Sequence, residues 1–151
     1  MKRRIIGSLL VCLLLVCLLP IQAFAQQREV IRFEDGSYTV VTVSREATAA
    51  RAINYTSGDK VFNYYSSANV LQWKAVLNAT FTYNGSSATC TSVNSLNVTI
   101  YDSSWSVGSK STSRSGNTAY GYLTMNGKLV GGTQGVPVTL TLTCDRNGNL
   151  S

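Results

Sequence analysis

Apolar and polar residues alternate with a period of two along much of this chain. The clearest stretch runs from Leu71 to Tyr83, where one set of alternate positions is apolar or aromatic and the other is largely polar, with Val76 as the exception. Successive side chains of a strand point to opposite faces, so this stretch is predicted to be a long strand with one buried face. Asn84-Gly85 follows at once and suits the positive φ angles of a tight hairpin, and a return strand is expected over about 87–93.

Two later stretches, 96–100 and 136–144, repeat the alternation and are predicted to be further strands with one buried face. Between them, the dipeptide Asn126-Gly127 predicts a second hairpin turn. This turn would join one strand over 117–125 to another over 128–131.

The N-terminal part of the chain predicts two more strands, 29–33 and 37–44, around the turn residues Glu34-Asp35-Gly36. The following segment, 45–52, is rich in alanine and fits a single helical turn or a linker. The whole arm, 26–52, is either a pro-segment or an edge hairpin packed on the main domain, and the sequence does not separate these two cases.

Many short strands, repeated turn dipeptides and few helix signals predict an all-β fold. We expect an antiparallel β-sandwich of Greek-key or immunoglobulin-like type with an N-terminal β-hairpin arm. A closed barrel is the alternative architecture. The expected divisions are a signal peptide over 1–25, the hairpin arm or pro-segment over 26–52 and the β-sandwich domain over 53–151.

Residues 1–25 have the layout of a secretory signal peptide. The basic triplet Lys2-Arg3-Arg4 precedes an apolar run from Ile5 to Leu19, and Ala23-Phe24-Ala25 supplies an A-x-A cleavage site. The run is short for a membrane span and no second one follows, so we expect a secreted, extracellular product without a membrane span. The leader also carries about half of the net charge of +6. The remaining basic residues are scattered, so no nucleic-acid partner is expected.

Two of the four cysteines, Cys12 and Cys17, lie in the leader, so the exported product keeps Cys90 and Cys144. Export leads to oxidising conditions, and one disulfide between Cys90 and Cys144 is therefore predicted. Cys144 is in phase with the apolar positions of its strand, so its sulfur is expected to point into the core. Two free buried thiols are the alternative, because some exporting bacteria live in reducing habitats.

The chain contains no histidine, which excludes Ser-His-Asp and Cys-His catalysis and His-bearing zinc sites. A carboxylate pair is the remaining acid–base design, and Asp102 and Asp145 are its best candidates. The segment 145–149 resembles the opening of a calcium loop, but its glycine does not stand at the required sixth position. We expect no catalytic residue, no metal, no cofactor and no enzyme activity.

Tyrosines are the remaining candidates for a binding surface. Tyr101 is out of phase with the apolar positions before it, and Tyr120 and Tyr122 stand opposite the apolar positions of their strand. Exposed rings of this kind can form a stacking platform for sugars, although half-buried tyrosines are also ordinary strand residues. Trp73 is in phase with the buried face and is interpreted as structural.

Five segments of the exported part together carry a resemblance to other proteins. They are Phe33-Glu34-Asp35-Gly36-Ser37-Tyr38, Phe81-Thr82-Tyr83-Asn84-Gly85, Ser103-Ser104-Trp105, Gly116-Asn117-Thr118-Ala119 and Leu142-Thr143-Cys144-Asp145-Arg146-Asn147-Gly148-Asn149-Leu150-Ser151. In these segments the chain resembles a family of small secreted proteins of unknown function from Gram-positive anaerobic bacteria. The resemblance implies export and a shared β domain that keeps both cysteines, and it implies no activity and no site residue.

The expected function is that of a secreted, non-catalytic β-sandwich binding module, which acts as a monomer. Its expected partner is a cell-envelope glycan or a cell-surface protein, bound through the speculative site Tyr101, Tyr120 and Tyr122. The alternative is a secreted effector of a bacteriocin-like or toxin-like kind, directed at a neighbouring cell.

Overall fold

The computed structural model describes residues 27–46, 54–129 and 132–151, and every regular element in these ranges is a strand. The strands are β1 (Gln27–Arg32), β2 (Tyr38–Arg45), β3 (Asn54–Tyr65), β4 (Leu71–Tyr83), β5 (Ala88–Ile100), β6 (Trp105–Ser115), β7 (Thr118–Leu129) and β8 (Gly132–Thr143). The predicted all-β class is confirmed. The predicted signal peptide lies outside the described residues, as does most of the predicted linker over 45–52.

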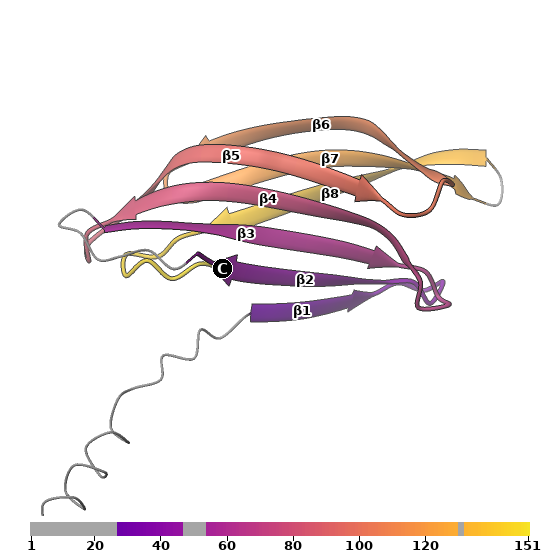
Figure 1. Ribbon diagram of the computed structural model, residues 1–151, viewed down its shortest axis with the longest axis horizontal. Helices are drawn as coiled ribbons and strands as arrows, with labels where there is room; N and C mark the ends of the chain where they lie inside the picture. The colour runs from indigo at the N-terminus through magenta and orange to yellow at the C-terminus, as the bar shows by residue number, and fades with distance from the viewer. Residues whose placement is uncertain (1–26, 47–53, 130–131) are drawn as a thin grey trace, which may run out of the picture.

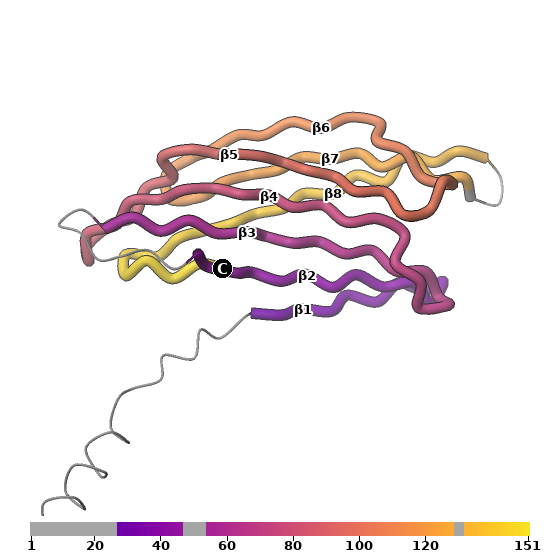
Figure 2. The backbone as a smooth tube through the Cα atoms, in the orientation of Figure 1, coloured from indigo at the N-terminus to yellow at the C-terminus, as the bar shows by residue number. Residues whose placement is uncertain are grey.

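The strands form two antiparallel sheets that pack on each other (Figure 1; Figure 2). Sheet A contains β1 to β5 and sheet B contains β6 to β8, in chain order in both sheets. The predicted two-sheet sandwich is therefore confirmed. The Greek-key or immunoglobulin-like order is not shown, because each strand pairs with its neighbours in sequence and both sheets are simple meanders. The chain changes sheets between β5 and β6.

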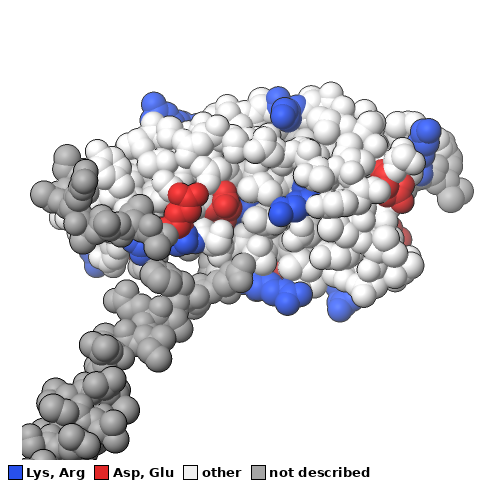
Figure 3. All heavy atoms as spheres, in the orientation of Figure 1, with Lys and Arg blue, Asp and Glu red and all other residues white. Residues whose placement is uncertain are grey.

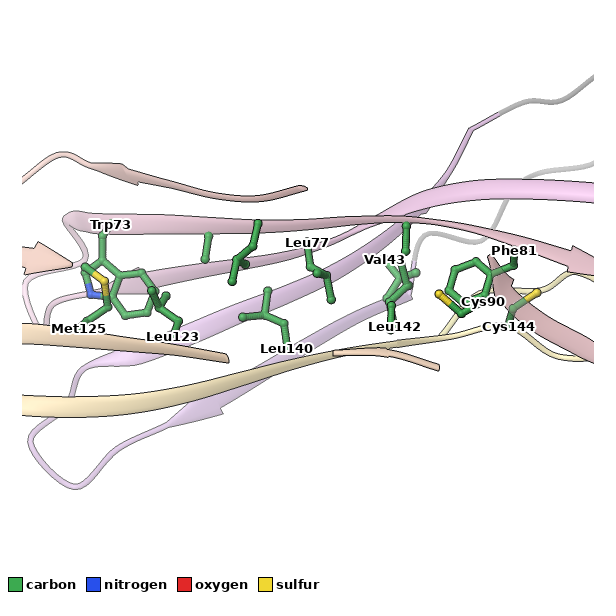
Figure 4. Packing of buried hydrophobic residues seen from close by; sticks show 14 of the residues in the cluster. Val43, Trp73, Leu77, Phe81, Cys90, Leu123, Met125, Leu140, Leu142 and Cys144 are labelled. Carbon is green, nitrogen blue, oxygen red and sulfur yellow. The ribbon is translucent and has the colours of Figure 1, made fainter. Parts of the chain in front are cut away.

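The core lies between the sheets and is built from alternate residues of β4, β7 and β8 (Figure 4). The members on these strands, with Cys144 just after β8, are nearly inaccessible to solvent: Trp73, Ala75, Leu77, Ala79, Phe81, Ala119, Leu123, Met125, Leu140, Leu142 and Cys144. Val43, Cys90, Leu96 and Trp105 complete the cluster. Burying a large apolar side chain contributes about 1.5–3 kcal/mol, so this layer accounts for the attraction between the sheets. The alternation predicted a buried face for β4 and for the last strand, and both are confirmed.

Strand β5 contains both of the shorter strands that were predicted over 87–93 and 96–100. Its register with β4 shifts twice. Asn78 pairs with Ser95, but the next residue, Ala79, pairs with Val93. Thr80 then pairs with Ser92, but Phe81 pairs with Cys90. Each shift is an irregularity of the bulge type, which changes the face toward which the following side chains point. The period of two is therefore broken within β5, although the strand is continuous.

The dipeptide Asn126-Gly127 lies inside β7 and does not form the predicted hairpin turn. Both residues are paired on both sides, Asn126 with Ser106 and Gly135, and Gly127 with Trp105 and Gln134. The glycine is needed for packing, because a Cβ at position 127 would stand 2.8 Å from Cη2 of Trp105. The prediction was wrong because a close approach between two strands requires the same residue as a tight turn.

The N-terminal hairpin is continuous with sheet A. Strand β2 pairs with β3 from Tyr38 to Arg45, and β1 pairs with β2 along its whole length. Val43 of β2 belongs to the core, whereas every residue of β1 is exposed. The described part of the arm thus has the form of an edge hairpin, one of the two cases that the sequence left open.

One side of the sandwich is closed by side chains of β6. Lys110 donates a hydrogen bond from Nζ to the carbonyl oxygen of Leu96 (3.2 Å), and Nη1 of Arg114 donates to the carbonyl oxygen of Cys90 (2.9 Å) and to that of Thr91. These carbonyls belong to β5, the last strand of sheet A. The two basic side chains therefore partly satisfy a sheet edge beside which the described residues place no further strand of sheet A.

Candidate functional site

Tyr120 and Tyr122 lie next to each other on the outer face of β7, the central strand of sheet B. Their rings are parallel to within 5°, with centroids 6.1 Å apart. Tyr122 is 42% exposed and Tyr120 is partly exposed, while Ala119 and Leu123 point into the core. The structure therefore places both tyrosines on the solvent side of the sheet, as the alternation predicted.

Each ring stands in the middle of a row that crosses the sheet. One row is Ser113, Tyr120 and Thr141, and the next is Ser111, Tyr122 and Thr139. The Ser113 hydroxyl donates to the phenol oxygen of Tyr122 at 3.4 Å. We call the outward surface of these six residues the hydroxyl face. It presents two aromatic rings between two lines of short hydroxyl side chains.

The hydroxyl face carries no charged side chain. Register places Lys110 opposite Leu123 and Arg114 opposite Ala119, on the inner side of β6, where both bind carbonyls of β5. Among the described outward positions of sheet B, the one charged residue is Lys128, near the end of β7. Figure 3 shows lysine and arginine side chains spread over the visible side of the molecule and not gathered in one patch.

Tyr101 lies apart from the other two predicted site residues. It is 57% exposed in the connection between β5 and β6, where its amide donates to the carbonyl oxygen of Gln72 (2.9 Å). The next strand begins with Trp105, which pairs with Gly127 near the end of β7, whereas Tyr120 lies near the start of β7. The structure therefore brings Tyr120 and Tyr122 together without Tyr101.

Tyr101 belongs instead to an apolar end of the sandwich that the sequence analysis did not identify. Two turns contact each other there, since a Cβ at Gly36 would lie 3.2 Å from Cβ of Ser67. The third connection at this end is held to β4 by the hydrogen bond from the Tyr101 amide to Gln72. Phe33 is 46% exposed and Val70 is 55% exposed in these turns. The sequence carries a signal for this apolar end, because Phe33 and Val70 are large apolar residues in turns, where polar residues are usual.

Cys90 and Cys144 are both buried and both free, so the predicted disulfide is not formed in this structure. Their amides donate to adjacent carbonyls of one turn, Cys90 to Gly116 and Cys144 to Asn117. Each thiol donates to a main-chain carbonyl: Cys90 to Ser92 (3.6 Å) and Cys144 to Asp145 (3.4 Å). The topology thus brings the two segments together, as Figure 4 shows, while each sulfur has its own acceptor. The orientation predicted for Cys144 is confirmed.

Burial raises the pKa of both thiols above the ordinary value. For Cys144 the pKa rises to about 11, and the neighbouring Asp145 carboxylate adds to the effect of burial. For Cys90 the Arg114 guanidinium opposes burial without cancelling it. Both groups are therefore protonated at neutral pH, which makes them poor nucleophiles.

The two carboxylates singled out from the sequence do not form a pair. Asp102 adjoins the start of β4, because its amide donates to Gln72, while the hairpin of Asp145 adjoins the end of β4, where Gly85 donates to Arg146. Each carboxylate accepts hydrogen bonds within its own turn, chiefly from Ser104 and Asn149 respectively, and this lowers the pKa of each. In the described ranges no group of three or more His, Cys, Asp or Glu could hold a metal ion.

The segment that resembled a calcium loop is a closed hairpin. The Asp145 carboxylate accepts bonds from the amides of Asn147 and Asn149, both at 2.8 Å, and from the Asn149 side chain. Cys144 forms a bridge with Leu150 across this hairpin. Protein donors therefore occupy the oxygens that a cation would need.

Comparison with known proteins gives a distant structural match. No family model matches the chain, and no curated protein matches it. The chain is similar to a hypothetical protein, lmo2686, from Listeria monocytogenes EGD-e, a Gram-positive bacterium, whose crystal structure was determined at 2.75 Å. The identity is 17% and the TM-score 0.48, over 83% of this chain and 90% of that chain. Membership of the family that the five segments resemble stays a prediction.

Proposed function

We propose that this protein is a secreted, non-catalytic binding module that holds a cell-envelope glycan on its hydroxyl face. The observation that carries the proposal is the parallel pair of tyrosine rings, 6.1 Å apart, on the outer side of β7. Across the two ladders, each tyrosine pairs with a serine of β6 and a threonine of β8, both of which have short hydroxyl side chains.

The chemistry of this surface matches that of a sugar. The C–H face of a pyranose ring packs on an aromatic ring, and its hydroxyls both donate and accept hydrogen bonds. Serine and threonine hydroxyls can either donate a hydrogen bond to the sugar or accept one from it, because each has one donor and two acceptor positions. Tyrosine adds a large contact area at a low cost in conformational entropy.

The rigidity of the site favours binding without rearrangement. Tyr120 and Tyr122 alternate with the core residues Ala119 and Leu123, so the backbone beneath the rings is held by the packing of the two sheets. A site on a strand is positioned more exactly than a site on a loop, and less of the binding free energy is lost in ordering it.

The test is capture of the purified protein by washed Gram-positive cell walls. Tyr120→Ala combined with Tyr122→Ala should weaken capture at least tenfold, about 1.4 kcal/mol, because exposed aromatic anchors dominate such interfaces. Tyr55→Ala is the matched control, since Tyr55 is 47% exposed on sheet A, the other sheet. Equal capture of the wild type and the double variant, with circular dichroism spectra unchanged, would refute the proposal.

The effector function has one observation in its favour, the apolar end formed by Phe33, Val70 and Tyr101. Exposed apolar groups gathered on one end of a domain are typical of contact with a membrane or a protein. In the described ranges no helix is long and apolar enough to cross a membrane. We expect contact of this kind to be made by these turns. Release of dye from lipid vesicles, lost in Phe33→Ser with Tyr101→Ser, would favour this function over glycan binding.

A further inference from the structure

We infer that the ligand of the hydroxyl face is an uncharged, linear polysaccharide that lies along β7, with successive sugar units over Tyr120 and Tyr122. This inference rests on the proposed function and specifies the class of glycan and its direction. Three features of the face carry it: a repeat, the absence of charge and an open surface.

The repeat lies in the two rows that cross the sheet. Each consists of a serine on β6, a tyrosine on β7 and a threonine on β8, and the second row reproduces the first two residues further along the strand. A ligand that moved by one row would meet the same groups in the same order. Such a surface matches a polymer of repeated units, whereas a single sugar would use only one row.

The absence of charged side chains from the hydroxyl face excludes acidic polymers. A carboxylate or phosphate that gives up its water on binding needs a cationic partner. The nearest basic side chains on β6, Lys110 and Arg114, face inward and already donate to carbonyls of β5. The face also has no carboxylate for a cationic ligand, since its residues are serine, threonine and tyrosine.

The surface is open, which favours the middle of a chain over its end. Tyr122 is 42% exposed, and the neighbouring positions Ser111, Ser113, Thr139 and Thr141 are exposed short side chains. No large side chain of the two rows rises beside the rings to enclose a terminal sugar. The next outward residues along β7, Thr118 and Thr124, are also short, so a polymer can extend past the two rings in both directions along β7.

The experiment is affinity electrophoresis through gels that contain a soluble polysaccharide. The neutral probes are hydroxyethyl cellulose, mannan and soluble starch, and the charged probes are carboxymethyl cellulose and polygalacturonate. We expect retardation by at least one neutral polymer, unchanged by added salt. The corresponding oligosaccharides should compete more strongly as their length increases, and the monosaccharide should not compete.

Four variants relate the result to the face. Tyr122→Ala should reduce retardation about tenfold, Tyr122→Phe should keep most of it because the ring remains, and Tyr55→Ala should leave it unchanged. Thr139→Asp should weaken binding to a neutral polymer less than Tyr122→Ala does. It should also prevent any residual binding of the two anionic probes, because the new carboxylate repels theirs.

The outcomes separate the inference from the proposed function. Tyrosine-dependent retardation by charged polymers alone, weakened by salt, would overturn the inference and keep a glycan-binding face. Competition by the monosaccharide as strong as by the oligosaccharides would also overturn it. Absence of tyrosine-dependent retardation in every gel, combined with equal capture of wild type and double variant by cell walls, would overturn both.

Discussion

The indole of Trp105 lies directly over Gly127, its partner in the ladder between β6 and β7. A Cβ at position 127 would stand 2.8 Å from Cη2 and 2.9 Å from Cζ3 of that ring. Trp105 is itself 8% exposed and contacts Tyr64 edge-on and Trp73 at a tilt. The glycine thus determines where the aromatic cluster at this end of the core can sit.

Gly127→Ala should destabilise the protein by about 1–3 kcal/mol, because the buried indole has little room to move away from an added methyl group. Chemical denaturation monitored by tryptophan fluorescence measures the change. Gly135→Ala is the control, since the nearest atom to its Cβ would be 3.4 Å away, an ordinary contact. Equal stability of the two variants would show that Trp105 does not require the glycine.

Arg114→Ala should destabilise the protein by about 1–2 kcal/mol, because the carbonyls of Cys90 and Thr91 would lose their charged donor. Hydrogen exchange should increase along β5 before it increases in β4. Arg146→Ala, at an exposed position of the C-terminal hairpin, is the matched control and should have little effect. An unchanged exchange rate in β5 would contradict the closure of the sheet edge by this side chain.

Cys90 and Cys144 should resist alkylation in the folded protein, and both should react once it is unfolded without reductant. Burial hides the sulfurs, and the raised pKa values leave little thiolate to react. Mass spectrometry after each treatment counts the modified thiols. An unfolded protein that takes up no alkylating reagent would instead contain the disulfide that the sequence predicted.

Stability should also fall as the pH rises from about 9 to about 11. The pKa of Cys144 rises from 9.0 in the unfolded chain to about 11 in the folded protein, so the folded state binds more protons within that window. The stabilisation is complete below pH 9 and is lost as the folded thiol titrates. Cys144→Ala should remove this part of the pH dependence, and an identical pH profile for wild type and variant would contradict the shift.

Asp145→Ala should open the C-terminal hairpin, because the carboxylate accepts hydrogen bonds from the amides of Asn147 and Asn149. The lowered pKa of Asp145 means that this contribution is present above the ordinary value of 3.8 and is lost as the pH falls through the folded value. Hydrogen exchange at Asn147 and Asn149 measures the opening. Asp102→Ala, a turn carboxylate at the other end of β4, should leave both amides unaffected.

The candidate site was predictable in part. Tyr120 and Tyr122 were assigned to an outer face from alternation along a single strand, and this holds because neighbouring residues of a strand must point to opposite sides. The position of the two parallel rings, between serines of β6 and threonines of β8, depends on the register of two ladders and could not be read from one strand. Tyr101 shares the exposure of the other two but not their location, which alternation cannot reveal.

The sequence by itself determined strands at β1, β2, β4 and β8, the buried faces of β4 and β8 and the inward direction of Cys144, because alternation is a property of consecutive residues. It did not predict β3 or β6. Only the tertiary structure decided the strand order, the role of Gly127 beneath Trp105, the continuity of β5 across its register shifts and the separate acceptors of the two thiols. These features depend on which residues meet across a ladder or between two sheets. Such contacts join positions far apart in the chain, and their geometry follows from the packing of the whole core.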